Sequence, residues 1–279
     1  MALALPLDVD PCAALTVVTM TNSSGVDRRG GSKLRESSDA GGYRLIELPW
    51  VQGHSFLQKV TALREVAMGA LRASCNDSVL LLTDAFDSFL SCTPARLMQT
   101  FTRLRVGVLF SVELDYSWQL KEDRPYYEAL AANASGRGFL NSGGIMGYAG
   151  QLLPLLDAAA QYVCTSRSCR GWFKGADQAA FSHVLASEPG RFNASLDYAN
   201  RVFLVPRVGW KVNNETAARF IDRLRTCGSC VVHVPWIRWA PSMRALTYIC
   251  MCICMCICRE PHRLASSRLL AERHLMCAP

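Results

Sequence analysis

Apolar runs of strand length, bounded by polar residues, recur along the chain and predict a buried sheet. Val79–Leu82 is wholly apolar, as expected of a strand buried on both faces. Ala14–Met20 and Arg44–Leu48 are also predicted to be strands. We expect the later strands at Val106–Ser111, Ile145–Tyr148, Leu196–Asp197, Arg201–Val205 and Cys230–Val234. Of these, Leu196–Asp197 and Arg201–Val205 are expected to form a pair.

Segments with helical spacing alternate with these strands, which predicts an α/β fold. Apolar residues recur at helical spacing from Phe56 to Arg72, as in an amphipathic helix. Pro94 suits the first turn of a second helix, Pro94–Phe101. Further helices are expected at Leu152–Tyr162, from Gly175 onward and at Asn214–Arg225. Residues 22–43 are rich in Ser, Gly, Arg and Asp, which predicts a mobile loop.

The chain is long enough for one sizeable domain with an appendage, because its 279 residues are 50% hydrophobic. We expect that domain at residues 14–236, between an N-terminal segment at 1–13 and a tail at 237–279. In the tail, Tyr248–Cys258 has Cys at every second position, a low-complexity pattern. A strand with its Cys on one face and a metallothionein-like cluster are the alternatives to a disordered tail.

The formal net charge of +7 raises the question of a nucleic-acid partner. Of the 30 basic residues, 25 are Arg, and they are scattered without runs. The tail from Ile237 carries six Arg and two acidic residues, so the rest of the chain is close to neutral. We therefore expect no basic groove and no nucleic-acid partner. The apolar run of the tail is too short for a spanning helix, so we also expect no membrane span.

Two carboxylates follow the apolar strand Val79–Leu82. Asp84 and Asp87 lie where that strand ends, and ligands of α/β sheets gather outside the carboxyl ends of strands. Two hard oxygen donors on one short turn suit a divalent cation, which can neutralise a diphosphate. The alternative is a turn with an Asp cap that leads into the next element.

A second informative stretch is Asn141-Ser142-Gly143-Gly144. Paired glycines let backbone amides approach a ligand closely, which is typical of a binding loop. The alternative is a hairpin turn of type I′ or II′ in front of the short strand at Ile145–Tyr148.

Several motifs between Gln58 and Val234 occur in an order that is similar to a known family. They are Gln58–Val60, Leu82–Asp87, Phe110–Glu113, Phe139–Tyr148, Asp177–Gln178, Leu196–Asp197 with Arg201–Phe203, and Val231–His233. The chain resembles the glycosyltransferase domain of procollagen lysyl hydroxylases and of the collagen galactosyl- and glucosyltransferases. The segment with these motifs covers about two thirds of the chain.

The resemblance implies a GT-A-like mixed sheet with flanking helices and a metal-dependent hexosyltransferase. The donor would be a UDP-sugar, and the acceptor a hydroxyl such as that of hydroxylysine or of a protein-linked sugar. It also implies a divalent cation such as Mn²⁺, held by Asp84, Asp87 and His233. A strand histidine that serves only for packing is the alternative for His233.

The resemblance assigns further residues to the donor. Thr19 would lie against the nucleotide, Lys59 would meet the phosphates, Trp118 would cover the donor sugar, and Asn141 and Ser142 would bind its hydroxyls. Gly143 and Gly144 would let the backbone approach the donor. A strand-terminal Thr, a surface Lys and a packing Trp are the alternatives for the first three.

Asp177 would act near the anomeric carbon, as a base on the acceptor or by steadying positive charge. A helix N-cap is the alternative role. The family has a run of Asp here and a Gly-Asn-Gly element with a Lys after its final His, whereas this chain has one Asp and continues with Val234-Pro235-Trp236. These departures favour a second hypothesis, a non-catalytic binder of nucleotide sugars or glycans.

Five N-glycosylation acceptors suggest the lumen of the endoplasmic reticulum or Golgi, or secretion. They begin at Asn22, Asn76, Asn133, Asn193 and Asn214. The seven Cys before residue 237 include Cys164/Cys169 and Cys227/Cys230, and disulfides are expected in that compartment. A redox or zinc site is the alternative for Cys227/Cys230. The N-terminus has no basic region of the kind that opens a signal peptide.

Overall fold

The computed structural model describes most of the expected domain. The described residues are 12–21, 33–50, 57–85, 87–114, 116, 119–134, 138–162, 176–205 and 229–233. The expected N-terminal segment before residue 12, the helix at Asn214–Arg225 and the tail lie outside them.

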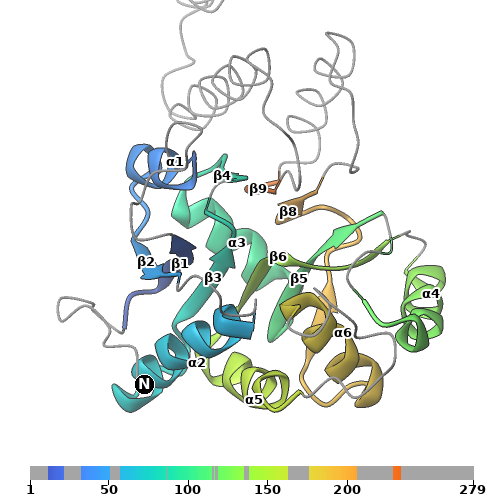
Figure 1. Cartoon of the computed structure of the whole chain (residues 1–279). Coiled ribbons are helices and arrows are strands. Elements are labelled where there is room, and N and C mark those ends of the chain that lie inside the picture. Colours follow the sequence, from blue (N-terminus) through green and yellow to red (C-terminus); the bar gives the residue numbers. More distant parts are fainter. Residues whose placement is uncertain are drawn as a thin grey trace, which may run out of the picture.

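The main sheet has six strands in the order β2-β1-β3-β6-β5-β7 (Figure 1). They are β2 (Leu45–Pro49), β1 (Leu15–Thr21), β3 (Val79–Thr83), β6 (Phe139–Tyr148), β5 (Val108–Glu113) and β7 (Ala194–Leu196). β1 runs parallel to β2 and β3, β5 runs parallel to β7, and β6 is antiparallel to both of its neighbours. A smaller sheet is formed by β4 (Ser88–Leu90), β9 (Val231–His233) and β8 (Phe203–Leu204).

Side chains of successive strand residues point to opposite faces of the main sheet, and both faces are apolar. Helices cover both faces and bury these side chains in two cores. Val18 and Leu80 point into the core on one face. The helices of that core are α2 (Leu57–Arg72), α4 (Arg124–Asn133), α5 (Ala149–Ala160) and α6 (Asp177–Ser187). A short 3-10 helix, Lys121–Asp123, precedes α4. Val17 and Leu81 point into the core formed with α1 (Lys33–Gly41), α3 (Pro94–Leu104) and the smaller sheet. This arrangement confirms the predicted mixed α/β sheet with flanking helices.

The prediction of a loop over residues 22–43 is wrong for its second half, where α1 runs from Lys33 to Gly41. The polar composition hides a helix with one narrow buried face. Leu34 and Ser38 are fully buried, and the Ser37 hydroxyl accepts the Leu90 backbone N–H at 3.0 Å. The helix is therefore stabilised over a loop by its packing against β4, a contact that the local sequence does not predict.

Two further expectations are corrected. Residues 139–148 form one ten-residue strand, β6, in place of a turn followed by a short strand, so the hairpin alternative is wrong. The predicted strand pair after residue 194 is split between two sheets, because β7 pairs with β5 and β8 pairs with β9. Asp197 makes this change of sheet possible, since its carboxylate accepts the backbone N–H groups of Arg201, Val202 and Phe203 at 2.7–2.9 Å.

Two disulfides join distant parts of the chain, Cys12 to Cys75 and Cys92 to Cys230. Because Cys230 is bonded to Cys92, the alternative of a redox or zinc site at Cys227/Cys230 is excluded. Among the described helices, none has both the length and the apolar character that crossing a bilayer requires.

Candidate metal centre and donor site

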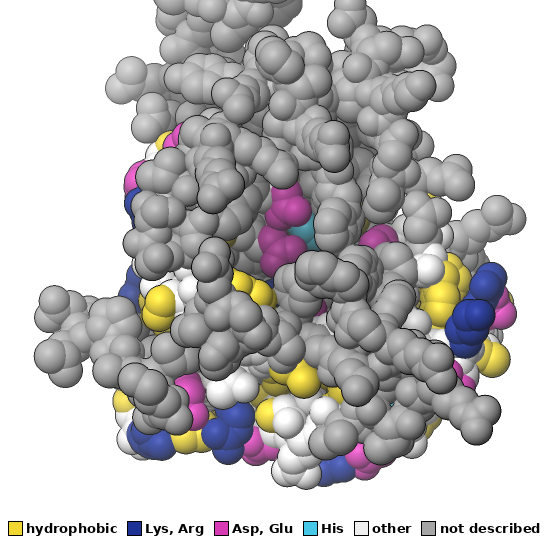
Figure 2. Space-filling view, in the orientation of Figure 1, with side chains coloured by type: hydrophobic (Ala, Val, Ile, Leu, Met, Phe, Trp, Pro, Cys, Tyr) yellow, Lys and Arg dark blue, Asp and Glu magenta, His cyan; other side chains and the backbone are white. Residues whose placement is uncertain are grey.

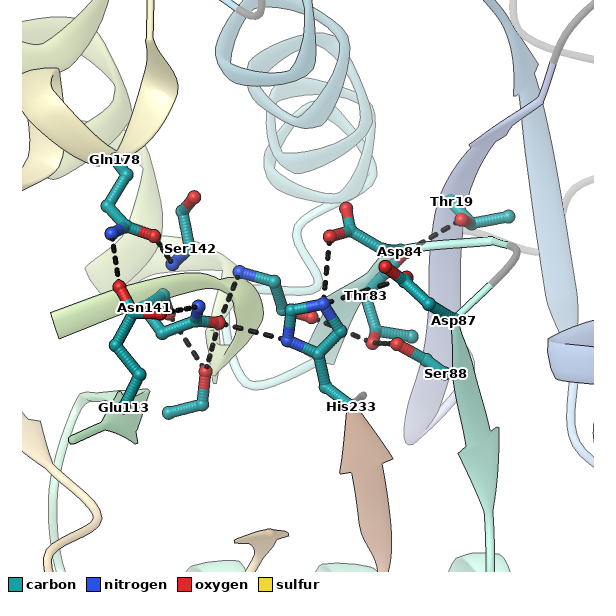
Figure 3. A network of polar contacts seen from close by, with 12 residues as sticks. Thr19, Thr83, Asp84, Asp87, Ser88, Glu113, Asn141, Ser142, Gln178 and His233 are labelled. Atoms are coloured by element: carbon teal, nitrogen blue, oxygen red, sulfur yellow. Dashed lines mark hydrogen bonds and ion pairs between the residues drawn. The ribbon is translucent and has the colours of Figure 1, made fainter. Parts of the chain in front are cut away.

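Two carboxylates and an imidazole converge where β3 ends (Figure 3). Asp84 directly follows β3, Asp87 directly precedes β4, and His233 is the last residue of β9. The antiparallel register pairs Ser88 with His233, which brings the imidazole beside Asp87. His233 Nε2 lies 3.2 Å from Asp84 Oδ2 and 3.6 Å from Asp87 Oδ1. One ligand atom from each of these three residues lies within 4.8 Å of the other two.

The hydrogen bonds of Asn141 determine which nitrogen of His233 carries a proton. Asn141 Nδ2 donates to Glu113 Oε2 at 3.2 Å, and because a carboxylate accepts, the amide oxygen must point the other way. That oxygen accepts the Gly143 backbone N–H at 2.9 Å and faces His233 Nδ1 at 3.0 Å. Since the amide oxygen can only accept, Nδ1 is the donor. In the neutral imidazole, Nε2 then presents its lone pair to the two carboxylates.

This orientation is fixed by a longer chain of hydrogen bonds across β5, β6 and α6. Glu113 Oε1 accepts from Gln178 Nε2 at 2.6 Å, and Gln178 Oε1 accepts the Ser142 backbone N–H at 3.1 Å. Ser111 Oγ donates to the backbone carbonyl of Asn141 at 2.8 Å. The residues of this chain of hydrogen bonds are all at least nine-tenths buried, namely Ser111, Glu113, Asn141, Ser142 and Gln178. The histidine is therefore held by groups that are shielded from water.

The donor set fits a divalent cation. Among the described residues, His233 Nε2 is a buried nitrogen that makes no hydrogen bond of ordinary geometry, although two carboxylates stand beside it. Carboxylate oxygens with one imidazole nitrogen are ligands that Mn²⁺ and similar ions accept in proteins. Asp84, Asp87 and Asp177 outnumber the single ammonium of Lys59, so the site has negative charge that a cation would balance.

The pKa values show how strongly the site favours positive charge. Burial opposes a charge on His233, but Asp87 and Asp84 outweigh it and raise the pKa of the imidazole to about 10. Burial also opposes a charge on Asp84, but Lys59 and His233 hold the pKa of that carboxyl well below its usual range. A site that binds a proton so firmly also suits a metal cation, for which the proton is a competitor.

Lys59 lies between the candidate metal ligands and the predicted catalytic carboxylate. Its Nζ is 2.8 Å from Asp84 Oδ1, 2.9 Å from Asp177 Oδ2 and 3.4 Å from the carbonyl oxygen of Ser142. Burial opposes the ammonium charge, but Asp177 and Asp84 outweigh it and raise the pKa of Lys59 above its ordinary value. The lysine is thus paired with two acids, and the alternative of a surface lysine is wrong because it is 7% exposed.

Asp177 is the first residue of α6, and its buried carboxylate faces Lys59. The alternative role as N-cap is wrong, because Ala176 occupies that position and makes no side-chain cap bond. The negative charge still lies at the positive end of the helix dipole, which favours it there.

The two glycines leave room for aromatic rings of the protein itself. The partner of Phe110 is Ile145 and the partner of Ser111 is Asn141, so residues 142–144 bulge out of the β5–β6 ladder. A Cβ on Gly143 would lie 2.0 Å from His233 Cε1, and one on Gly144 would lie 2.7 Å from the ring of Phe203. Gly143 therefore lines the space that the imidazole of His233 occupies.

Other predicted residues are placed differently. Thr19 is fully buried and its hydroxyl donates to the Thr83 carbonyl at 2.7 Å, so it joins β1 to β3 beside the site. Ser142 is buried and contributes its backbone to Lys59 and Gln178. Trp118 lies outside the described residues. Glu113 and Gln178 lie in motifs that carry the resemblance, but the sequence indicates no role for them, because their contacts depend on strand register.

The site opens to solvent through its carboxylates. The side chains of Asp84 and Asp87 are 34% and 29% exposed, whereas that of His233 is 3% exposed. In Figure 2, acidic side chains lie beside a histidine near the middle of the visible face. A ligand would therefore meet oxygen donors first, with the nitrogen behind them.

Comparison with known proteins gives three findings. Residues 52–163 match the family model described as the PLOD GT domain. The chain is 30% identical over 149 residues to procollagen-lysine,2-oxoglutarate 5-dioxygenase 1 of Pongo abelii, a match that covers 52% of this chain and 18% of that protein. A solved glycosyltransferase involved in the glycosylation of the major capsid of PBCV-1 aligns over 85% of this chain and 100% of its own, at 10% identity and a TM-score of 0.48. The segment matched by the family model contains Asp84, Asp87 and Asn141, but not His233.

Proposed function

We propose that this chain moves a hexose from a UDP-sugar to a hydroxyl acceptor, a proposal supported by the match of residues 52–163 to the family model of the PLOD GT domain. The hexose is glucose or galactose, and the acceptor is hydroxylysine or a protein-linked sugar. The reaction depends on a divalent cation, with Mn²⁺ the first candidate.

One observation carries the proposal, namely the cluster of Asp84, Asp87 and His233 at the carboxyl end of β3. Two carboxylates and an imidazole with its Nε2 lone pair directed at them would hold the cation. When bound, the cation supplies a Lewis acid for the diphosphate of the departing UDP.

The residues around the cluster orient it. Lys59 fixes Asp84 from the side opposite to His233, because it binds the other carboxylate oxygen. The same ammonium holds Asp177, our candidate for the group that assists the acceptor hydroxyl or the developing positive charge. Asn141 acts through His233, since its amide is used by Glu113 and the imidazole. Thr19, Ser142 and Trp118 stay predicted donor contacts.

The test is UDP release from UDP-glucose and UDP-galactose, with and without Mn²⁺ and a hydroxylysine peptide. We expect turnover that requires Mn²⁺ and is abolished by Asp87→Ala. Asp157→Ala is the matched control, because Asp157 forms a partly exposed ion pair with Arg64 away from the cluster. Turnover that survives a chelator or persists in Asp87→Ala would refute the proposal.

A specific observation favours a second candidate, a non-catalytic binder of nucleotide sugars. The carboxylate of Asp177 is engaged by a buried lysine, and Val234-Pro235-Trp236 follows His233 where the family has its Gly-Asn-Gly element. Tight, Mn²⁺-dependent binding of UDP with no turnover of any UDP-sugar would support the binder over the enzyme.

For the compartment we propose the lumen of the endoplasmic reticulum or Golgi, or the cell exterior. Two disulfides support it, as do the exposed acceptors Asn76, Asn133 and Asn193. A shift in gel mobility on treatment with an N-glycosidase is expected for the protein expressed in its own cells. Absence of the shift would contradict the proposal.

A further inference from the structure

The Cys92–Cys230 disulfide joins the same two strands that carry two of the candidate cation ligands. In the antiparallel pair of β4 and β9, Ser88 is opposite His233 and Leu90 is opposite Val231. Asp87 and His233 therefore lie at one end of the pair, and Cys92 and Cys230 lie just beyond the other end. The strands are three residues long, so the covalent link is only a few residues from the ligands.

The link is built into the core. Cys92 is 7% exposed and Cys230 is fully buried. The Tyr43 hydroxyl donates to the Cys92 carbonyl at 2.8 Å, and the Ser91 backbone N–H donates to the Cys230 carbonyl at 2.9 Å. One end of β9 is thus fixed to β4 by a covalent bond in addition to the ladder.

Register matters here more than in a longer strand. A slip of one residue turns every side chain of a strand to the opposite face, which would move His233 away from Asp84 and Asp87. A three-residue strand has few ladder hydrogen bonds to oppose such a slip. The disulfide removes this freedom, because it fixes which residues of the two strands stand opposite each other.

We propose that the Cys92–Cys230 disulfide is a positioning element of the cation site, and that the site binds its cation more weakly when this bond is reduced. The proposal rests on the cation site proposed above. Metal–ligand distances are held to about 0.2 Å, so small excursions of β9 are enough to weaken binding. We expect at least about a tenfold loss of Mn²⁺ affinity without the bond.

The second disulfide provides a matched control. Cys12–Cys75 ties the segment before β1 to the turn before β3, so it lies at the opposite end of β3 from Asp84. It closes 63 residues and Cys92–Cys230 closes 138, and the entropy of loop closure depends only weakly on that difference. The loop-closure entropy lost with either bond is therefore expected to be similar, and the buried pair Cys92–Cys230 additionally loses packing in the core.

The first experiment compares Cys92→Ala/Cys230→Ala with Cys12→Ala/Cys75→Ala by Mn²⁺ titration, followed by electron paramagnetic resonance, and by thermal unfolding. We expect both double variants to unfold at lower temperature. Only the first should bind Mn²⁺ at least about tenfold more weakly than the wild type. Unchanged affinity in the first variant, or an equal loss in both, would overturn the proposal.

The second experiment uses the wild-type chain and needs no variant to fold. If the disulfide favours the cation, the cation must favour the disulfide by the same factor. The chain is equilibrated with mixtures of reduced and oxidised dithiothreitol, which gives two electrons and two protons to each disulfide and is left as its own cyclic disulfide. Thiol alkylation and mass spectrometry then measure the reduced fraction of each pair, with and without Mn²⁺.

A tenfold effect corresponds to a shift of about 30 mV for this two-electron couple. Saturating Mn²⁺ should lower the reduction potential of Cys92–Cys230 by at least that amount and leave Cys12–Cys75 unchanged. No shift, or the same shift for both bonds, would overturn the proposal while the cation site stands. If the wild type binds no Mn²⁺ at all, the cation site fails and this inference fails with it.

Discussion

Gly143→Ala tests the placement of His233 with a single methyl group. A Cβ at this position would lie 2.0 Å from His233 Cε1 and 2.3 Å from Nδ1. Ordinary contact begins at 3.4 Å, so the ring would have to withdraw by about 1.4 Å, the difference between 3.4 and 2.0 Å. That displacement is several times the tolerance of about 0.2 Å in metal–ligand distances. The methyl group would also disturb the bond between His233 Nδ1 and Asn141.

We expect Gly143→Ala to weaken Mn²⁺ binding by roughly 100-fold or more, because a ligand and its orienting hydrogen bond are both lost. Overpacking should also lower the free energy of unfolding by about 1–3 kcal/mol. Mn²⁺ titration by electron paramagnetic resonance measures the first effect, and chemical denaturation measures the second.

Gly144→Ala is the matched control, since the two glycines are neighbours in one strand. Its Cβ would lie 2.7 Å from the ring of Phe203, which is not a candidate ligand. We expect a similar loss of stability with much of the Mn²⁺ affinity kept. Wild-type Mn²⁺ affinity in Gly143→Ala would contradict the role of His233 as a ligand. An equal loss in both variants would mean that the effect is only general destabilisation.

Further predictions concern the hydrogen bond of His233, the protonation of its imidazole and the turn at Asp197. Asn141→Leu removes the acceptor of His233 Nδ1–H and should weaken Mn²⁺ binding by about 10- to 100-fold in the same titration. Because the pKa of His233 is about 10 in the metal-free site, Mn²⁺ binding near pH 8 should release about one proton, measured by calorimetry in buffers of different ionisation enthalpy. No release would contradict Nε2 as a ligand. Since this pKa is raised, the stability that charged His233 gives the metal-free protein is complete below about pH 6.5 and is lost as the pH rises towards 10, which thermal unfolding can follow. Asp197→Ala leaves three backbone N–H groups without their acceptor and should lower the free energy of unfolding, measured by chemical denaturation, by about 1–3 kcal/mol.

The sequence predicted the parts of the fold with strong local patterns. The apolar run of β3 and the helical spacing of α2 gave both elements within one or two residues of their ends, because one type of burial governs each of them. α1 was missed, and only the second half of β6, Ile145–Tyr148, was predicted. The former is polar and depends on β4 for its stability, and the latter contains two glycines that suggest a turn.

The sequence predicts the place of a site residue only where that place follows directly from the end of a strand. Asp84 and Asp87 follow a buried strand, so their place at the edge of the sheet could be inferred from the sequence. His233 came from the family resemblance, since no local pattern relates β9 to β3. The roles of Glu113 and Asn141 depend on the bulge in β6, which the sequence does not specify in a recognisable way.

The proposed function depends on Asp84, Asp87 and His233 holding a divalent cation together. Crystals grown with Mn²⁺ and UDP, and measured by anomalous diffraction, test it most directly. We expect one strong anomalous peak among these three side chains, within about 2.0–2.3 Å of His233 Nε2 and of a carboxylate oxygen from each Asp. A Mn²⁺ peak elsewhere, with His233 Nε2 still facing the carboxylates and no metal between them, would contradict it.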